Sequence, residues 1–183
     1  MESNEKIIAG CKKNDRKAQQ ALYEKFGPKM YGHCLRYAGN VEEAQDVLQD
    51  GFMKVFEKIS SLKDANSLEG WMSRIFINLA LSNYRKRKAG PDLIEMEPLQ
   101  EVLTDKDDDI PQDELDPKLV LQQIQKLPEK YRLVLNAYAI DGLSHKEIAS
   151  LLDTTESNTK SILSRARKIM RDWLNKKDNK KND

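Results

Sequence analysis

The sequence contains few of the residues from which catalytic and metal centres are built. Its 183 residues include two cysteines and two histidines, and aromatic residues make up 7%. Cys11 and Cys34 have no spacing typical of a disulfide framework or a zinc site, and neither His33 nor His145 stands at ligand spacing from them. A glycine-rich phosphate loop and a nucleophile elbow are also missing. The sequence therefore predicts no catalytic residue, no metal and no cofactor, and it disfavours an enzyme.

Long apolar segments are missing as well. The chain has no run of about 18 apolar residues, so we expect no membrane insertion. The N-terminal residues lack the basic stretch followed by an apolar stretch that marks a secretory signal. Without a signal or a disulfide framework, the sequence predicts a cytoplasmic protein.

Charged residues, in contrast, are abundant and unevenly placed. They make up 33% of the chain, yet the net charge is only +1. Basic residues gather at 85–88 and again from Lys160 onward, whereas residues 92–116 are rich in Asp, Glu and Pro. Self-repulsion and proline predict an extended linker for this acidic stretch. Two basic modules joined by an acidic linker favour a polyanionic partner, and a solvated surface is the alternative.

The periodic segments all have helical spacing, and no strand-like alternation persists. We expect a helix from Asn14 or Asp15 that Gly27-Pro28 ends, and a second that Gly39-Asn40 ends. Further helices are expected at about 41–59 and 67–88 and, beyond the linker, from Pro117 and Pro128 onward. The predicted fold class is all-α, with two small helical domains joined by an acidic flexible linker. The predicted bounds are a first domain at 1–90, a linker at 91–115, a second domain at 116–176 and a charged tail at 177–183.

The expected helix at 41–59 has two different faces. One face is apolar and should enter the core, and it carries Ala44, Val47, Leu48, Val55, Phe56 and Ile59. A second face carries Asp46, Gln49, Asp50 and Met53, which recur at i, i+3, i+4 and i+7. This second face suits docking on a basic helical partner, and an ordinary solvated face is the alternative that spacing leaves open. Gly51 costs about 1 kcal/mol inside a helix, which a close backbone approach would explain.

The expected helix at 67–88 ends in a strongly basic segment. Asn78, Ser82 and Arg85 share one angular sector, where an amide can contact base edges. The run Arg85, Lys86, Arg87 and Lys88 can neutralise phosphates. Trp71 could stack on an exposed base, although core packing is favoured for it. The polar segment at 60–70 could form a loop that holds an unpaired base.

Residues 143–173 have the pattern of a helix-turn-helix. Ser144 and Glu147 form a capping box, and His145 lies in the capping turn, where we expect it at the surface. A three-residue turn at 153–155 leads into a second helix, with Ile162, Leu163, Ala166, Ile169, Met170 and Trp173 on its inner side. Its outer side is polar and then basic, as in a helix that reads the major groove. The candidate DNA-contacting residues are Thr155, Ser157, Asn158, Lys160, Ser161 and Arg165. The alternative is an ordinary helical hairpin.

These motifs together resemble the extracytoplasmic-function (ECF) group of the sigma-70 family. The segment from Asp46 to Phe52 resembles region 2.2, which clamps the coiled coil of the polymerase β′ subunit. Trp71, Asn78 and the run at 85–88 resemble regions 2.3 and 2.4, which melt and read the −10 element. Residues 127–132 resemble the start of domain 4, and residues 144–167 resemble its helix-turn-helix, which reads the −35 element. The chain departs from the family pattern at Ser82 and Gly51.

The resemblance implies a sigma factor that is not an enzyme and that directs promoter-specific initiation. The implied partners are core RNA polymerase, through its β′ coiled coil and β flap, promoter DNA and an anti-sigma factor. The implied polymerase contacts are Asp46, Gln49, Asp50 and Met53, and the implied −10 contacts are Trp71, Asn78, Ser82 and Arg85 to Lys88. Two rival functions differ in class. A stand-alone helix-turn-helix regulator would bind a palindrome without polymerase, and an enzyme would need catalytic residues that the sequence lacks.

Overall fold

The computed structural model describes residues 3–88 and 116–179, with side chains to residue 175. The chain divides into two compact units, residues 1–80 and 81–183. Over the described ranges every regular element is helical, which confirms the predicted all-α fold class. The predicted linker at 91–115 lies outside the described residues, and the predicted domain bounds stay a prediction.

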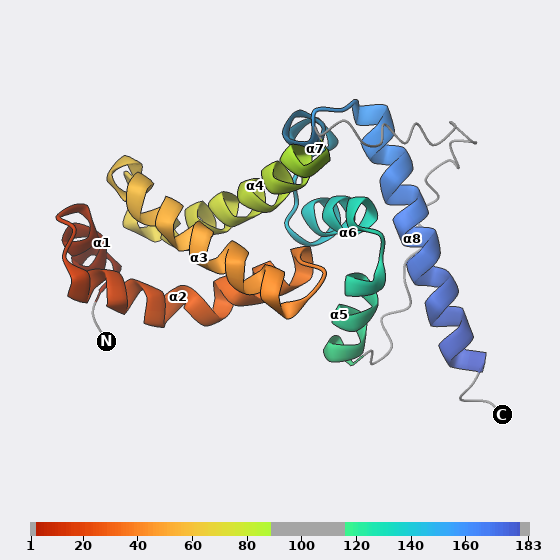
Figure 1. Cartoon of the computed structure of the whole chain (residues 1–183), viewed down its shortest axis with the longest axis horizontal. Helices are drawn as coiled ribbons and strands as arrows, with labels where there is room; N and C mark the ends of the chain where they lie inside the picture. Colours follow the sequence, from red (N-terminus) through yellow and green to blue (C-terminus); the bar gives the residue numbers. More distant parts are fainter. Residues whose placement is uncertain (1–2, 89–115, 180–183) are drawn as a thin grey trace. The chain divides into compact units, whose positions relative to one another are not determined.

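The first unit begins with three helices joined by short, capped turns. They are α1 (Asn4–Lys12), α2 (Arg16–Tyr37) and α3 (Val41–Lys58), and α2 packs against both α1 and α3 (Figure 1). Asp15 caps α2, and Asn40 caps α3 by accepting a hydrogen bond from the Glu43 backbone at 2.7 Å. Two 3₁₀ turns follow, η1 (Ile59–Ser61) and η2 (Ala65–Ser67), and then α4 (Leu68–Lys88). The sequence did not predict α1.

Helix α2 is continuous where the sequence predicted a break at Gly27-Pro28. Pro28 lies inside a helix of 22 residues. It has no N–H to donate to the Glu24 carbonyl, which costs one helical hydrogen bond. Phe26 and Met30, on either side of the expected break, are both buried in the core of the first unit. Tertiary burial on both sides of Pro28 therefore holds the helix together across it.

An aromatic cluster forms the centre of the first unit. The Phe52 ring lies 4.7 Å from the Tyr23 ring and 5.6 Å from the Phe76 ring, between centroids. A side chain at Gly51 would overlap the Phe76 ring. The structure shows a close approach that explains this glycine, since only glycine lets α3 lie this near to the Phe76 ring. Phe52 itself is buried, although the predicted core face of this helix did not include it.

The described part of the second unit contains the last residues of α4, from Leu81 to Lys88, followed by four further α-helices and one π-helical turn. These are α5 (Pro117–Lys126), α6 (Glu129–Leu135), the π-helix η3 (Asn136–Ile140), α7 (His145–Leu152) and α8 (Glu156–Asn179) (Figure 1). Asp116 caps α5 with Pro117 at its start, as predicted. Helix α8 packs against both α6 and α7. Gly142, with φ of 70°, makes the predicted turn into α7.

A buried arginine joins two helices of the second unit. The Arg132 guanidinium donates to the backbone carbonyls of Gln125 and Leu127, at 3.1 and 3.0 Å. These carbonyls lie at the C-terminal end of α5, where helical carbonyls lack intrahelical donors. Arg132, on α6, therefore supplies hydrogen-bond donors to the carbonyls at the end of α5. Most of the predicted inner side of α8 is buried or half-buried, but Ile169 is exposed, so its placement in the core was wrong.

Candidate functional site

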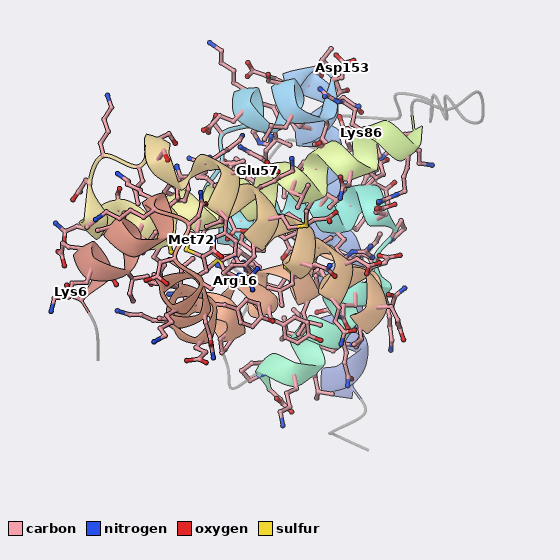
Figure 2. The ribbon with its side chains drawn as sticks, turned by 60° about the vertical axis from the view of Figure 1, so that its left-hand side comes forward. Lys6, Arg16, Glu57, Met72, Lys86 and Asp153 are labelled. Atoms are coloured by element: carbon pink, nitrogen blue, oxygen red, sulfur yellow. The ribbon has the colours of Figure 1, made fainter. Side chains whose placement is uncertain are left out.

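The acid-and-amide face of α3 is open to solvent. Asp46, Gln49, Asp50 and Met53 are all exposed, and Met53 keeps 55% of its surface accessible. A single exposed apolar side chain is common on protein surfaces, so its meaning depends on the apolar groove beside it. The structure thus brings the four residues predicted for polymerase binding onto one accessible surface. Glu57 is also exposed, near the C-terminal end of α3 (Figure 2).

A groove of about 960 Å³ lies beside this face, between α2 and α3. Gln49 and Met53 line it from α3, and aromatic rings form much of its wall, from Tyr23, Tyr31, Phe52 and Phe56. Sequence reasoning did not identify the α2 residues of this groove. The signal was present in Tyr23 and Tyr31, because two tyrosines beside a helical proline are an unusual choice for a purely solvated face. Pro28 lines the groove too, next to the Glu24 carbonyl that it leaves without a helical donor.

The segment predicted to hold an unpaired base is a short connection with many exposed polar residues. Asp64 accepts a hydrogen bond from the Asn66 backbone at 3.0 Å, and the Ser67 hydroxyl donates to the Asp64 carbonyl at 2.8 Å. The Lys12 ammonium donates to the Leu62 carbonyl at 2.9 Å. Helix α1 therefore braces this connection, which leaves polar side chains exposed at Ser60, Ser61, Lys63, Asp64, Asn66 and Ser67.

Helix α4 presents the predicted −10 residues unequally. Asn78 and the basic run from Arg85 to Lys88 are exposed, and Lys86 marks this end of the helix in Figure 2. Ser82 is half-buried. Trp71 packs against the core of the first unit, as favoured from the sequence, and only part of its ring remains for an outside contact.

The helix-turn-helix forms as predicted in the second unit. Ser144 and Glu147 make the reciprocal hydrogen bonds of a capping box at the start of α7. The turn after α7 is made by Asp153, whose φ of 54° is left-handed, and the Thr154 N–H donates to the Ala149 carbonyl at 2.9 Å (Figure 2). Asp and Asn tolerate this conformation better than most residues do. The turn sets the direction in which α8 leaves.

The predicted −35 residues are Thr155, which directly precedes α8, and five residues in the first three turns of α8. Thr155, Ser157 and Lys160 are exposed, while Asn158, Ser161 and Arg165 are half-buried. The Asn158 amide donates to the Thr154 hydroxyl at 2.8 Å, and the Ser161 hydroxyl donates to the Ser157 carbonyl at 3.1 Å. These bonds orient the two side chains before any DNA contact, and Lys160 is the predicted contact with a fully exposed cation.

His145 is more than the surface residue that the sequence predicted. It is half-buried, its ring stacks on Tyr138 at 4.3 Å between centroids, and its Nδ1 lies 3.0 Å from the Thr159 hydroxyl. Thr159 is fully buried although it is polar. Sequence reasoning missed both residues as a pair, because they lie 14 positions apart on different helices.

The thiols and acids of the described residues do not form a reactive centre. Cys11 and Cys34 are buried, and burial raises the pKa of Cys34 to about 12. At neutral pH this thiol is uncharged and a poor nucleophile. No cluster of His, Cys, Asp or Glu suited to a metal occurs in the described part of the chain. No helix there is long and apolar enough to cross a bilayer.

Comparisons with known proteins agree with this arrangement. The family model for sigma-70 region 2 matches residues 22–90, and that for sigma-70 region 4 matches residues 118–170. The ECF RNA polymerase sigma factor SigW of Bacillus subtilis is 31% identical over 181 residues, which cover 92% of this chain and 95% of SigW. The RNA polymerase sigma-H factor of Pseudomonas aeruginosa is 28% identical, covering 92% of each chain.

One solved structure supports the fold. It contains the sigma factor RpoE from Bartonella quintana in complex with the anti-sigma factor NepR, and the match covers 85% of this chain and 96% of the other at a TM-score of 0.52 and 20% identity. With two family models in the expected order and a relative above 30% identity along almost the whole chain, this protein belongs to the ECF group of sigma-70 family sigma factors.

Proposed function

We propose that the exposed face of α3, formed by Asp46, Gln49, Asp50 and Met53, is the surface that docks on core RNA polymerase. The observation that carries this proposal is the exposure of all four side chains beside an apolar groove. Carboxylates at the edge steer a basic partner helix and orient it. Met53 and the aromatic wall of the groove supply apolar area that such a helix can bury. Family membership supports a second contact, between the second unit and the β flap.

Promoter recognition is divided between the two units in this proposal. The exposed Asn78, with the connection at 60–67, would capture an unpaired base of the −10 element, and residues 85–88 would hold phosphates. Capture must offset unstacking, which costs a few kcal/mol per base. Helix α8 would enter the major groove at the −35 element through its first three turns. Polymerase would hold both units near the promoter, so neither needs tight DNA binding alone.

The docking surface is tested by reversing its charge. The double variant D46R/Q49R should lose binding to purified core polymerase by at least tenfold, because two cations would face a basic partner. Both positions are exposed on α3, so circular dichroism and the melting temperature should stay unchanged. Lys58→Glu, also exposed on α3 but turned away from the proposed face by helical spacing, is the charge-reversal control. Binding that survives in D46R/Q49R would reject this surface.

The proposed DNA-contacting surface of α8 is tested with the same purified core polymerase. K160A/R165A should weaken −35-dependent transcription and reduce its dependence on salt concentration, because fewer phosphate counterions are released. Polymerase binding should remain. An unchanged salt slope would show that α8 does not contact the DNA backbone.

An anti-sigma factor is the second partner that we propose. The RpoE relative was crystallised with one, and the groove between α2 and α3 offers an apolar site next to the proposed polymerase face. A protein that covers this groove would prevent polymerase docking by occupying adjacent surface. We place this regulation, like transcription itself, in the cytoplasm.

A further inference from the structure

A chain of side-chain contacts links the recognition helix α8 to the rest of the second unit. The His145 ring, in the first turn of α7, stacks on the ring of Tyr138 in η3 with centroids 4.3 Å apart and planes 24° apart. Its Nδ1 lies 3.0 Å from the hydroxyl oxygen of Thr159 in the first turn of α8. The guanidinium carbon of Arg167, two turns further along α8, lies 5.8 Å from the centre of the Tyr138 ring.

The direction of the His145 hydrogen bond follows from the proton count at Thr159. The Thr159 hydroxyl has one proton, and it donates this proton to the Glu156 carbonyl at 2.8 Å. With that proton directed at Glu156, the hydroxyl oxygen accepts from the imidazole, and we therefore assign the proton of His145 to Nδ1. Thr159 is fully buried, so without His145 its oxygen would lose the imidazole donor and keep only the hydrogen bond to the Glu156 carbonyl.

We propose that His145 is a positioning residue for −35 recognition, which sets the orientation of α8 through Thr159 and the Tyr138 ring. Thr159 lies between Asn158 and Lys160, two of the predicted DNA contacts, so a rotation of α8 about this point moves both. Arg167 contacts the Tyr138 ring from the same helix, so α8 is held at two points about two turns apart. This inference rests on the proposed function of α8, and His145 itself need not touch DNA.

Precise placement matters more here than in an ordinary helix pair. Base-edge hydrogen bonds require donor–acceptor distances near 3 Å and good alignment. A small rotation of α8 therefore weakens discrimination between base pairs more than it weakens phosphate contacts, which tolerate a wider range of geometry. The expected signature of the His145–Thr159 pair is thus in promoter selectivity.

Four variants separate the ring stack on Tyr138 from the hydrogen bond between His145 and Thr159. H145F keeps an aromatic ring to stack on Tyr138 but removes the donor, and H145N keeps an amide donor near the position of Nδ1 but removes the stack. T159V keeps the shape of the side chain and removes the hydroxyl, and T159S restores the hydroxyl. Ser150→Ala, at an exposed position of α7, is the control.

The experiment uses the full chain with purified core polymerase, on the promoter that the wild-type protein transcribes best from a library. The measured quantity is the ratio of initiation on the intact promoter to initiation on one with a scrambled −35 element. We expect H145F and T159V each to lower this ratio by about two- to tenfold, the range of one net hydrogen bond. The double variant H145F/T159V should lower this ratio no further than either single variant does. T159S should keep the wild-type ratio, and H145N should fall between H145F and wild type.

The outcomes separate positioning from a purely structural role. A structural role would lower the melting temperature and reduce initiation on both promoters equally, which would leave the ratio unchanged and overturn the proposal. Additive effects in the double variant, or a T159S protein as impaired as T159V, would overturn it too. If the wild-type protein fails to initiate with core polymerase, the proposed function itself is wrong. If the wild-type protein does initiate, and H145F and T159V show the same promoter ratio as wild type, then only the positioning role is rejected.

Discussion

The two units of this sigma factor use different interactions to fix their functional helices. In the first unit, α3 is held by large apolar side chains around the Phe52 ring, and the closest approach is made possible by Gly51. In the second unit, α8 buries an apolar side and adds the polar contact of the His145–Thr159 pair, while Arg132 ties α6 to the end of α5. Both arrangements leave one helix face exposed for a partner.

The difference follows from the side chains available in each unit. Aromatic rings bury large areas and exclude neighbouring conformations by shape alone, so a surface built on them is rigid without specific hydrogen bonds. The inner side of α8 contains smaller residues, including Ala166, and its polar ties supply direction instead. Aromatic packing is sufficient for a surface that docks on a protein. Base reading gains more from directional hydrogen bonds, because its own contacts depend on alignment.

The largest effect expected is from removing the central ring of the first unit. Phe52→Ala should lower the free energy of unfolding of that unit by about 3–5 kcal/mol, through lost burial and the cavity left behind. Hydrogen exchange, read separately for each unit, is the suitable measurement. Phe56→Ala is the matched control, since Phe56 is only half-buried and should cost less. Equal loss of protection in the second unit would break the comparison.

A smaller effect is expected from Arg132 in the second unit. Arg132→Met keeps much of the side-chain volume but leaves the Gln125 and Leu127 carbonyls without their guanidinium donor. We expect a loss of about 1–3 kcal/mol, the usual cost of an unsatisfied buried polar group. Lys126→Met, at an exposed site on α5, should change stability little. A more stable Arg132→Met protein would show that apolar packing could have replaced the polar tie, as happens for some buried ion pairs.

The predictability of the fold differs between local and long-range features. The capping box at Ser144 and the turn at 153–155 follow from local rules on capping and turns, and both were predicted correctly. Helix propensity marked Gly51 as a position that needs an explanation, and the Phe76 ring supplies it. The break at Gly27-Pro28 was wrong for the same reason, since a local rule gave way to burial of the flanking residues. Only the three-dimensional packing reveals that balance.

The candidate site shows the same limit. Asp46, Gln49, Asp50 and Met53 share a face because helical spacing dictates it, so their common exposure could be predicted. The α2 wall of the groove and the His145–Thr159 contact join residues from different helices, and no spacing within one segment reveals them. Phe52 was missed although it lies within the apolar stripe, one helical turn from both Leu48 and Phe56, so helical spacing could have identified it.

Two helical glycines in the first unit contrast an effect as large as that of Arg132 with the smallest effect expected. Gly51→Ala should destabilise the protein by about 1–3 kcal/mol, because the new methyl group must displace the Phe76 ring. Gly32→Ala places its methyl group in open space and should stabilise the protein by about 0.5–1 kcal/mol through higher helix propensity. Thermal unfolding of both variants measures the contrast. Two changes of the same sign would show that Phe76 adapts at little cost.

The burial of both cysteines has a consequence for how this sigma factor can sense its surroundings. Each side chain is only 1% accessible, and the chain has no other sulfhydryl group. Peroxides and disulfide reagents react with accessible thiolates, so the native protein offers them no target at either cysteine. An oxidative signal that acts through a thiol and leaves this factor folded must therefore be received by another part of the system, such as a protein that holds the factor inactive.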